Sequence, residues 1–118
     1  MKKVVVAGSR NYNNYEEAKK FITNCLSEEA DKDIVFIVGS CRGADMLGER
    51  FAQEMGYKLE SYPAEWSKYG KAAGPLRNKK MAEICDLVIC FWDGKSRGSA
   101  TMIDFARKLG KPVVIKYI

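Results

Sequence analysis

The strongest constraint on how this chain can fold is the alternation of short apolar runs with longer amphipathic segments. The apolar runs are rich in β-branched residues and contain no polar positions, which is typical of strands buried on both faces of a parallel sheet. These runs are residues 4–6, 34–38, 87–91 and 113–115, and a less apolar run over 57–62 is predicted to be an edge strand.

The segments between these strands place apolar residues at helical spacing. We predict helices over residues 15–29, 44–55, 75–85 and 98–109, the last of them ended by Gly110 and Pro112. The resulting β-α-β-α-β-α-β-α-β order, with right-handed crossovers, gives a three-layer, doubly wound α/β sheet. Residues 63–74 show no clear periodicity and are expected to form a long, functional connection.

Length and composition bound the domain organisation and the chemistry. A chain of 118 residues with 47% hydrophobic residues suits one compact domain over residues 1–118. It has no histidine, and its four cysteines form no Cys-x-x-Cys pair, so we expect no metal and no cofactor. The lack of histidine also removes the usual general base and every Ser-His or Cys-His nucleophile pair.

The cysteines and the first residues of the chain indicate in which cellular compartment the protein is expected. We interpret the cysteines as reduced core thiols. The apolar start is too short for a signal peptide and leads directly into Ser9 and Arg10, and no apolar stretch is long enough to cross a bilayer. We therefore expect a cytoplasmic protein with no membrane partner.

The formal net charge of +5 is unevenly distributed. Residues 1–65 contain 9 Lys and Arg against 11 Asp and Glu, whereas residues 66–118 contain 11 against 4. The second half should therefore attract anions, which could be a phosphate-bearing ligand or a nucleic-acid backbone.

Three strand-to-helix turns combine glycine, serine and arginine, and all three lie at the carboxyl end of the predicted sheet. Glycine lets a ligand approach the backbone, serine offers a hydroxyl, and the following helix presents unpaired N–H groups that suit phosphate. The candidate residues of these turns are Gly8, Ser9 and Arg10, then Gly39, Ser40, Arg42 and Gly43, and finally Ser96, Arg97, Gly98 and Ser99.

Cations stand at the predicted beginnings of helices, where acidic residues are favoured unless an anion binds nearby. We assign phosphate contacts to Arg10, Arg42, Arg77 and Arg97, because a guanidinium fork matches phosphate oxygens. Lys79 and Lys80, in the same stretch as Arg77, are interpreted as solvated surface charges.

Four further residues each have two interpretations. Trp66 or Tyr69 could stack on a base or on a sugar face, or Trp66 could pack its loop against the following helix. Asp45 could cap its own helix or bind a ribose hydroxyl. Cys41 could be a thiol of lowered pKa at a helix start, but we favour a small loop residue.

Several motifs together resemble one family over nearly the whole chain. They are Val6-Ala7-Gly8-Ser9-Arg10, Gly43-Ala44-Asp45, Pro63-Ala64-Glu65-Trp66, Tyr69-Gly70-Lys71, Ala73-Gly74-Pro75-Leu76-Arg77-Asn78 and Phe91-Trp92-Asp93-Gly94 followed by Ser96-Arg97-Gly98-Ser99. With them the chain resembles the small bacterial and phage proteins of the DUF2493 group. That group belongs to the SLOG superfamily, which also holds the LOG phosphoribohydrolases and the Rossmann-like part of the DNA-processing protein DprA.

The resemblance implies a Rossmann-like parallel sheet of five strands in the order 3-2-1-4-5, a nucleotide-related ligand and possible homo-oligomers. It adds Asn78 to the candidate ligand-binding residues. LOG enzymes carry Pro-Gly-Gly-x-Gly-Thr-x-x-Glu; aligning its last glycine and threonine on Gly98 and Ser99 places Met102 where the glutamate is expected. We therefore do not carry over the phosphoribohydrolase activity.

Three functions remain open from the sequence. The first is binding or sensing of a phosphate-bearing, nucleotide-derived ligand at the carboxyl ends of the sheet. The second is hydrolysis of an N-glycosidic or phosphate-ester bond in a nucleotide, with Glu65, Asp45 or Asp93 as the catalytic carboxylate. The third is DprA-like binding of single-stranded nucleic acid, which the basic second half would permit.

Overall fold

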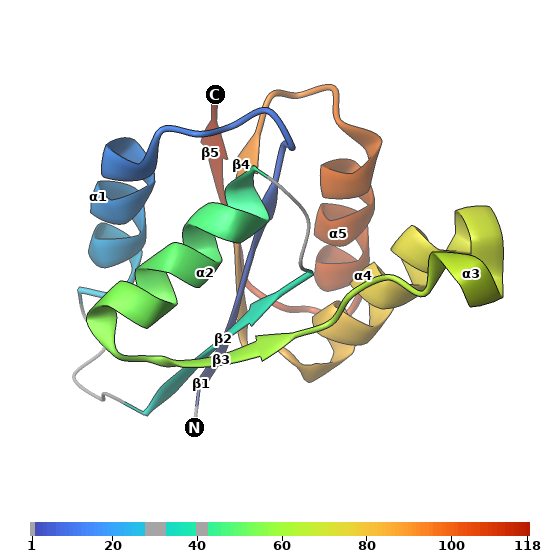
Figure 1. Ribbon diagram of the computed structural model, residues 1–118, viewed down its shortest axis with the longest axis horizontal. Helices are drawn as coiled ribbons and strands as arrows, with labels where there is room; N and C mark the ends of the chain where they lie inside the picture. Colours follow the sequence, from blue (N-terminus) through green and yellow to red (C-terminus); the bar gives the residue numbers. More distant parts are fainter. Residues whose placement is uncertain (1, 28–32, 40–42) are drawn as a thin grey trace.

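Five parallel strands form a single sheet in the order β3-β2-β1-β4-β5 (Figure 1). The computed structural model describes residues 2–27, 33–39 and 43–118. Its strands are β1 (Lys2–Gly8), β2 (Ile34–Val38), β3 (Lys58–Ser61), β4 (Leu87–Trp92) and β5 (Val113–Tyr117). The main helices are α1 (Tyr15–Cys25), α2 (Ala44–Met55), α4 (Ala73–Ile84) and α5 (Arg97–Lys108). The predicted α/β class and strand order are confirmed.

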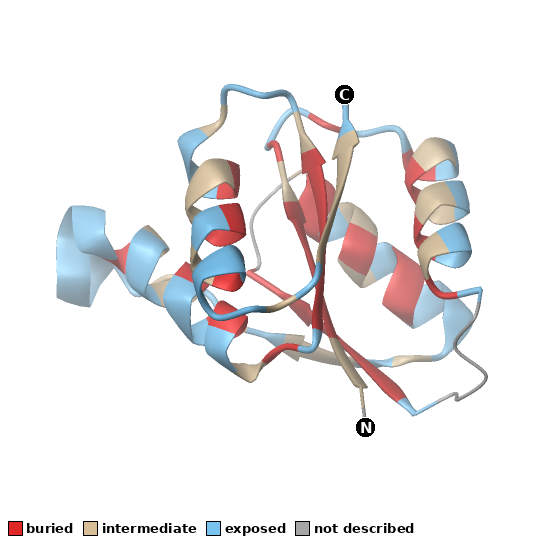
Figure 2. Cartoon of the chain, turned by 180° about the vertical axis from the view of Figure 1, so that it is seen from behind, coloured by how far each residue is buried: buried red, intermediate tan, exposed pale blue. Residues whose placement is uncertain are grey.

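The sheet is buried between two helical layers. Successive side chains of a strand point to opposite faces, so Val4 and Val6 pack with α1 and α2, through residues such as Phe51. Val5 points to the other face, where it packs with α4 and α5 through residues such as Met81. Figure 2 shows the buried strands at the centre, between helices that turn their exposed sides outward. Because both faces are covered, the apolar runs need no polar positions.

The point where the chain direction across the sheet reverses lies between β1 and β4. Gly8, the last residue of β1, is in register with Phe91 of β4. The chain leaves β1 toward α1 on one face of the sheet and leaves β4 toward α5 on the other. The two strand ends therefore separate toward opposite layers, and a crevice for ligands forms at such a point in doubly wound sheets.

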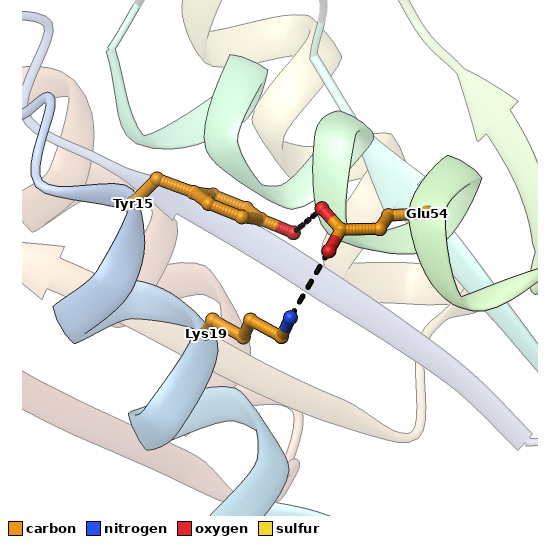
Figure 3. Close-up of polar contacts among 3 residues, drawn as sticks. All are labelled: Tyr15, Lys19 and Glu54. Atoms are coloured by element: carbon orange, nitrogen blue, oxygen red, sulfur yellow. Dashed lines mark hydrogen bonds and ion pairs between the residues drawn. The ribbon is translucent and has the colours of Figure 1, made fainter.

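A polar contact between helices fixes α1 against α2. The Tyr15 hydroxyl donates to Glu54 Oε2 at 2.6 Å, and Lys19 Nζ lies 3.0 Å from Glu54 Oε1 (Figure 3). The Arg50 guanidinium lies 3.8 Å above the centre of the Tyr15 ring, where a cation is attracted to the face of the aromatic ring.

The structure corrects two predicted boundaries. Residues 63–74 are not an unstructured connection, because they contain the short helix α3 (Trp66–Tyr69), the turn η1 (Gly70–Ala72) and the start of α4. Pro75 is tolerated inside the first turn of α4 because its missing N–H would have no helical partner there. The first helix ends at Cys25 rather than at residue 29; residues 28–32 lie outside the described part of the chain.

Within the residues that the structure describes, no helix is both long and apolar enough to cross a bilayer.

Candidate functional site

A cavity of about 320 Å³ opens at the carboxyl ends of β1 and β4. Its walls come from the end of β1, the β1–α1 turn, the β4–α5 turn, the middle of α4, and the first halves of α2 and α5. The residues that line it are Ala7, Gly8, Ser9, Arg10, Asn11, Asp45, Arg77, Asn78, Met81, Asp93, Ser96, Arg97, Gly98, Ser99 and Met102.

The β1–α1 turn is held against the end of β4. The backbone N–H of Ser9 donates to the carbonyl of Phe91 at 2.9 Å, and the Asp93 N–H donates to the Ser9 hydroxyl at 3.3 Å. A Cβ on Gly8 would overlap that Phe91 carbonyl, and its φ of +150° is rarely adopted by other residues. Glycine is thus required for the close approach of the two turns.

Asp93 shapes the turn that leads into α5. Its Oδ1 accepts the backbone N–H groups of Ser96 and Lys95, each at 2.8 Å. These two bonds, that from Ser96 first, lower the pKa of Asp93 below its usual value. The turn places Ser96 just before the helix, with its hydroxyl 3.0 Å from the Ser99 hydroxyl.

Two arginines from different turns line this cavity. Arg10 follows β1 and Arg97 begins α5, and both side chains are exposed. Within the described part of the chain, neither guanidinium group has a hydrogen-bond or ion-pair partner. Two cations without direct partners beside the amino-terminal end of α5 make this cavity favourable for an anion.

Arg77 is held more firmly than the other two arginines. Its Nη1 donates to the carbonyls of Gly39 and Tyr62, which follow β2 and β3, and its Nε donates to Asn78 Oδ1 at 2.9 Å. The Asn78 amide donates in turn to the Gly98 carbonyl at 3.1 Å. This chain of bonds links α4 to the ends of three neighbouring elements.

Gly39 makes room for the guanidinium group. A Cβ at Gly39 would overlap Arg77 and approach Asp45 Oδ2. Asp45 is buried, and its Oδ2 accepts the Gly39 N–H at 3.1 Å. Among the described residues, the Asp45 carboxylate thus bonds to the segment that precedes α2. It makes no hydrogen bond to Gly43, the described residue just before the helix.

The structure has a second, more apolar cavity of about 450 Å³. Both cavities share Arg77 as a lining residue. The second cavity lies between the end of β3 and the segment containing α3 and α4, and it is lined by Ser61, Tyr62, Pro63, Glu65, Tyr69, Ala73, Leu76, Arg77 and Lys80. Trp66 lines neither cavity; it is 51% exposed, and its ring lies against Gly74 of α4.

The structure brings together most of the residues predicted to bind the ligand. The first cavity contains Gly8, Ser9, Arg10, Asp45, Arg77, Asn78, Ser96, Arg97, Gly98 and Ser99, whereas Gly39, Gly43 and Trp66 do not line it. Of the carboxylate candidates, Asp45 and Asp93 lie in the first cavity and Glu65 in the second. Ser40, Cys41 and Arg42 lie outside the described residues, and so do the predictions made for them.

Four of the residues that line the first cavity were not predicted to contact a ligand or to act in catalysis. Asn11 directly follows the predicted loop, and only its position beside Arg10 could have indicated it. Ala7, Met81 and Met102 are buried residues whose apolar character gave no signal of a ligand. Met102 stands where the LOG alignment expects a glutamate, so a thioether lines the cavity at that point.

The described cysteines are free thiols in the core or packed against it. Cys85 and Cys90 are buried, and burial raises the pKa of Cys90 to about 12. Burial also raises the pKa of Cys85 and of the partly buried Cys25. In residues 2–27, 33–39 and 43–118, no group of three or more Cys, Asp or Glu side chains could hold a metal ion.

Comparison with known proteins adds sequence relatives. A model of the YspA, cpYpsA-related SLOG family matches residues 2–69. The Gene 61 protein of Mycobacterium phage D29 is 31% identical over 123 residues, which cover 97% of this chain and 95% of the phage protein.

Solved structures share the fold at low identity. DNA processing protein A from Streptococcus pneumoniae superposes with a TM-score of 0.73 at 22% identity. The match covers 97% of this chain but only about half, 49%, of that protein. A structural-genomics target, TM1055, gives 0.69 at 23% identity, with 96% and 72% covered. DNA processing protein A from Helicobacter pylori, described for its single-stranded DNA binding mode, gives 0.64 at 19% identity, with 97% and 64% covered.

Proposed function

The chain belongs to the YspA, cpYpsA-related SLOG family, as its sequence motifs predicted, and from this we propose that it binds a phosphate-bearing, nucleotide-derived ligand in the first cavity. The observation that carries the proposal is the pair Arg10 and Arg97. These exposed guanidinium groups line one cavity from two different turns, and within the described residues neither has a hydrogen-bond or ion-pair partner. An anion would satisfy both.

The chemistry around the two arginines suits a phosphate group. The backbone N–H groups at the beginning of α5 point out of the helix without helical partners. The hydroxyls of Ser96 and Ser99 bond to each other, which leaves one O–H of the pair to donate to a phosphate oxygen. A volume of about 320 Å³ lies at the small end of the range for ligand pockets, which favours a phosphate or sugar-phosphate group there.

Binding measurements on single arginine variants test this proposal. We expect Arg97→Ala and Arg10→Glu each to weaken binding of ADP by about 1.5–3 kcal/mol, the range for hydrogen bonds to charged groups, as measured by calorimetry. Arg107→Ala is the matched control, because Arg107 lies in the last turn of the same helix, away from the cavity. Unchanged affinity in both cavity variants, with circular dichroism showing an intact fold, would overturn the proposal.

Nucleic-acid binding is a second candidate. It is favoured by the excess of basic residues in 66–118 and by the exposed rings of Trp66 and Tyr69, on which bases could stack. It also fits the single-stranded DNA binding mode described for the protein from Helicobacter pylori, whose fold this chain shares.

Hydrolysis of a nucleotide has weaker support. Asp93 has a lowered pKa and its Oδ1 is occupied by two backbone N–H groups, so it suits an anion that shapes the turn better than a proton donor. Asp45 Oδ2 is likewise bonded to the Gly39 N–H. We therefore place binding or sensing ahead of catalysis.

A further inference from the structure

We propose that the second cavity receives the base of the nucleotide whose phosphate occupies the first cavity, and that Tyr69 and Glu65 recognise this base. The inference rests on the proposed function, because it assigns the other end of the same ligand. Its starting point is that one residue, Arg77, lines both cavities.

Arg77 is a fixed boundary between the two cavities. Its guanidinium group bonds to the carbonyls of Gly39 and Tyr62, and its Nε to Asn78, so packing and hydrogen bonds define its position. A ligand that occupied both cavities would contact this cation, because Arg77 lines both. The stretch of a nucleotide between its base and its outer phosphate carries negative charge, which suits such a contact.

The lining of the second cavity differs from that of the first in a way that suits a base. Tyr69 is 43% exposed and Leu76 is 46% exposed, so apolar surface of this cavity wall is open to a ligand. Lys68 Nζ lies 5.1 Å from the centre of the Tyr69 ring and adds a positive charge beside it. Pro63 adds a further apolar wall. Stacking of a base on an exposed tyrosine is a common mode of nucleotide recognition and is independent of the base.

Glu65 gives this wall a preference among bases. Glu65 lines the same cavity as Tyr69, which lies four residues further along the chain. An ionised carboxylate only accepts hydrogen bonds, so it favours a base that donates from an exocyclic amine and disfavours one with a carbonyl at that place. If Glu65 faces this position of the base, a nucleotide of adenine or cytosine binds more tightly than one of hypoxanthine or uracil, which carry a carbonyl there.

Three probes separate the two ends of the ligand: inorganic pyrophosphate, ADP and inosine 5′-diphosphate. Pyrophosphate tests the first cavity alone, ADP tests both cavities, and inosine 5′-diphosphate lacks the exocyclic amine. We expect the protein to bind ADP at least tenfold more tightly than pyrophosphate. Tyr69→Ala should weaken ADP binding about 5- to 150-fold, the range for loss of one stacked base, and change pyrophosphate binding less than twofold.

Two variants test the preference for an amine and the need for a ring. Glu65→Ala should remove the preference for ADP over inosine 5′-diphosphate while leaving pyrophosphate binding within twofold. Tyr69→Phe, which keeps the ring, should retain ADP affinity within twofold. Trp66→Ala is the matched control, because Trp66 is an exposed ring of the same short helix that lines neither cavity.

The outcomes distinguish this inference from the proposed function. If pyrophosphate and ADP bind with equal affinity and Tyr69→Ala changes neither, the phosphate site stands and the base site is wrong. If Trp66→Ala weakens ADP binding as much as Tyr69→Ala, the ligand contacts the exposed face of α3 rather than the cavity. If neither pyrophosphate nor ADP binds, the proposed function and this inference both fail.

Discussion

Gly39 is a single residue on which the position of Arg77 depends. A methyl group at this position would meet the guanidinium of Arg77 on one side and the carboxylate of Asp45 on the other. The guanidinium could move away only by giving up its hydrogen bonds to the carbonyls of Gly39 and Tyr62. Each of the two carbonyls would then lose a hydrogen-bond donor while staying partly buried, which costs stability.

We therefore predict that Gly39→Ala lowers the free energy of unfolding by about 1–3 kcal/mol, the usual cost of overpacking, as measured by urea denaturation. Gly98→Ala is the control: a Cβ there would point into open space, and alanine is the better helix former. That variant should be at least as stable as the parent protein. Equal stability of Gly39→Ala and the parent would show that Arg77 does not need the space.

Among single residues, the sequence indicated the polar residues that line the first cavity well and the apolar ones poorly. Arg10 and Arg97 were assigned from the chemistry of their turns, and the structure places both in one cavity. Met81 and Met102 gave no such signal, because an apolar residue on a helix looks the same in sequence whether it faces the core or a cavity. The bonds of Arg77 to the carbonyls of Gly39 and Tyr62 join distant parts of the chain, and local spacing carries no information about them.

Tyr15 and Glu54 join α1 to α2, and the shifted pKa values of these two residues make the contribution of this contact to stability testable. Burial and the bond to Glu54 raise the pKa of Tyr15 to about 12. The hydrogen bonds from Tyr15 and Lys19, in that order, lower the pKa of Glu54. The folded state thus favours a protonated Tyr15 and an ionised Glu54, and each preference contributes to stability over its own range of pH.

For Tyr15 this contribution is complete below pH 10, the ordinary pKa of tyrosine, and is lost between about pH 10 and 12. For Glu54 it is present above the ordinary pKa of 4.5 and is lost as the pH falls through its lowered value. Tyr15→Phe should therefore destabilise the protein most between about pH 5 and 10, and the difference from the parent should shrink at both ends. Urea denaturation of both proteins across this range checks the prediction, and a difference independent of pH would contradict it.

Among the elements, the five strands and four main helices followed from apolar periodicity, whereas α3 and η1 did not. Four helical residues are too few to display a period, and every residue of α3 is exposed (Figure 2), so no apolar stripe marks it. The turn after α3 depends on Gly70 at a φ of +55°. A glycine that ends a short helix cannot be told from one in an irregular loop by sequence alone.

At the scale of the whole molecule, the uneven charge allows the two binding functions to be separated. Residues 66–118 carry the positive excess, and they include α5 and the basic side chains of α4. Such a field attracts both a nucleotide and a nucleic-acid strand. The two differ in how many phosphates the protein neutralises, and that number determines how binding depends on salt.

A single strand that contacts about five phosphates should lose about 100-fold in affinity when salt rises from 50 to 200 mM, since the slope is about 0.7 per phosphate. A nucleotide held by Arg10 and Arg97 in one cavity engages at most a few charges, so we predict that ADP binding falls less than tenfold over the same range. Calorimetry with ADP, and fluorescence anisotropy with a labelled thymidine oligonucleotide, give both slopes on one protein. If the oligonucleotide still binds more tightly than ADP at 200 mM salt, the basic half of the chain serves nucleic acid, and the first cavity is not its main site.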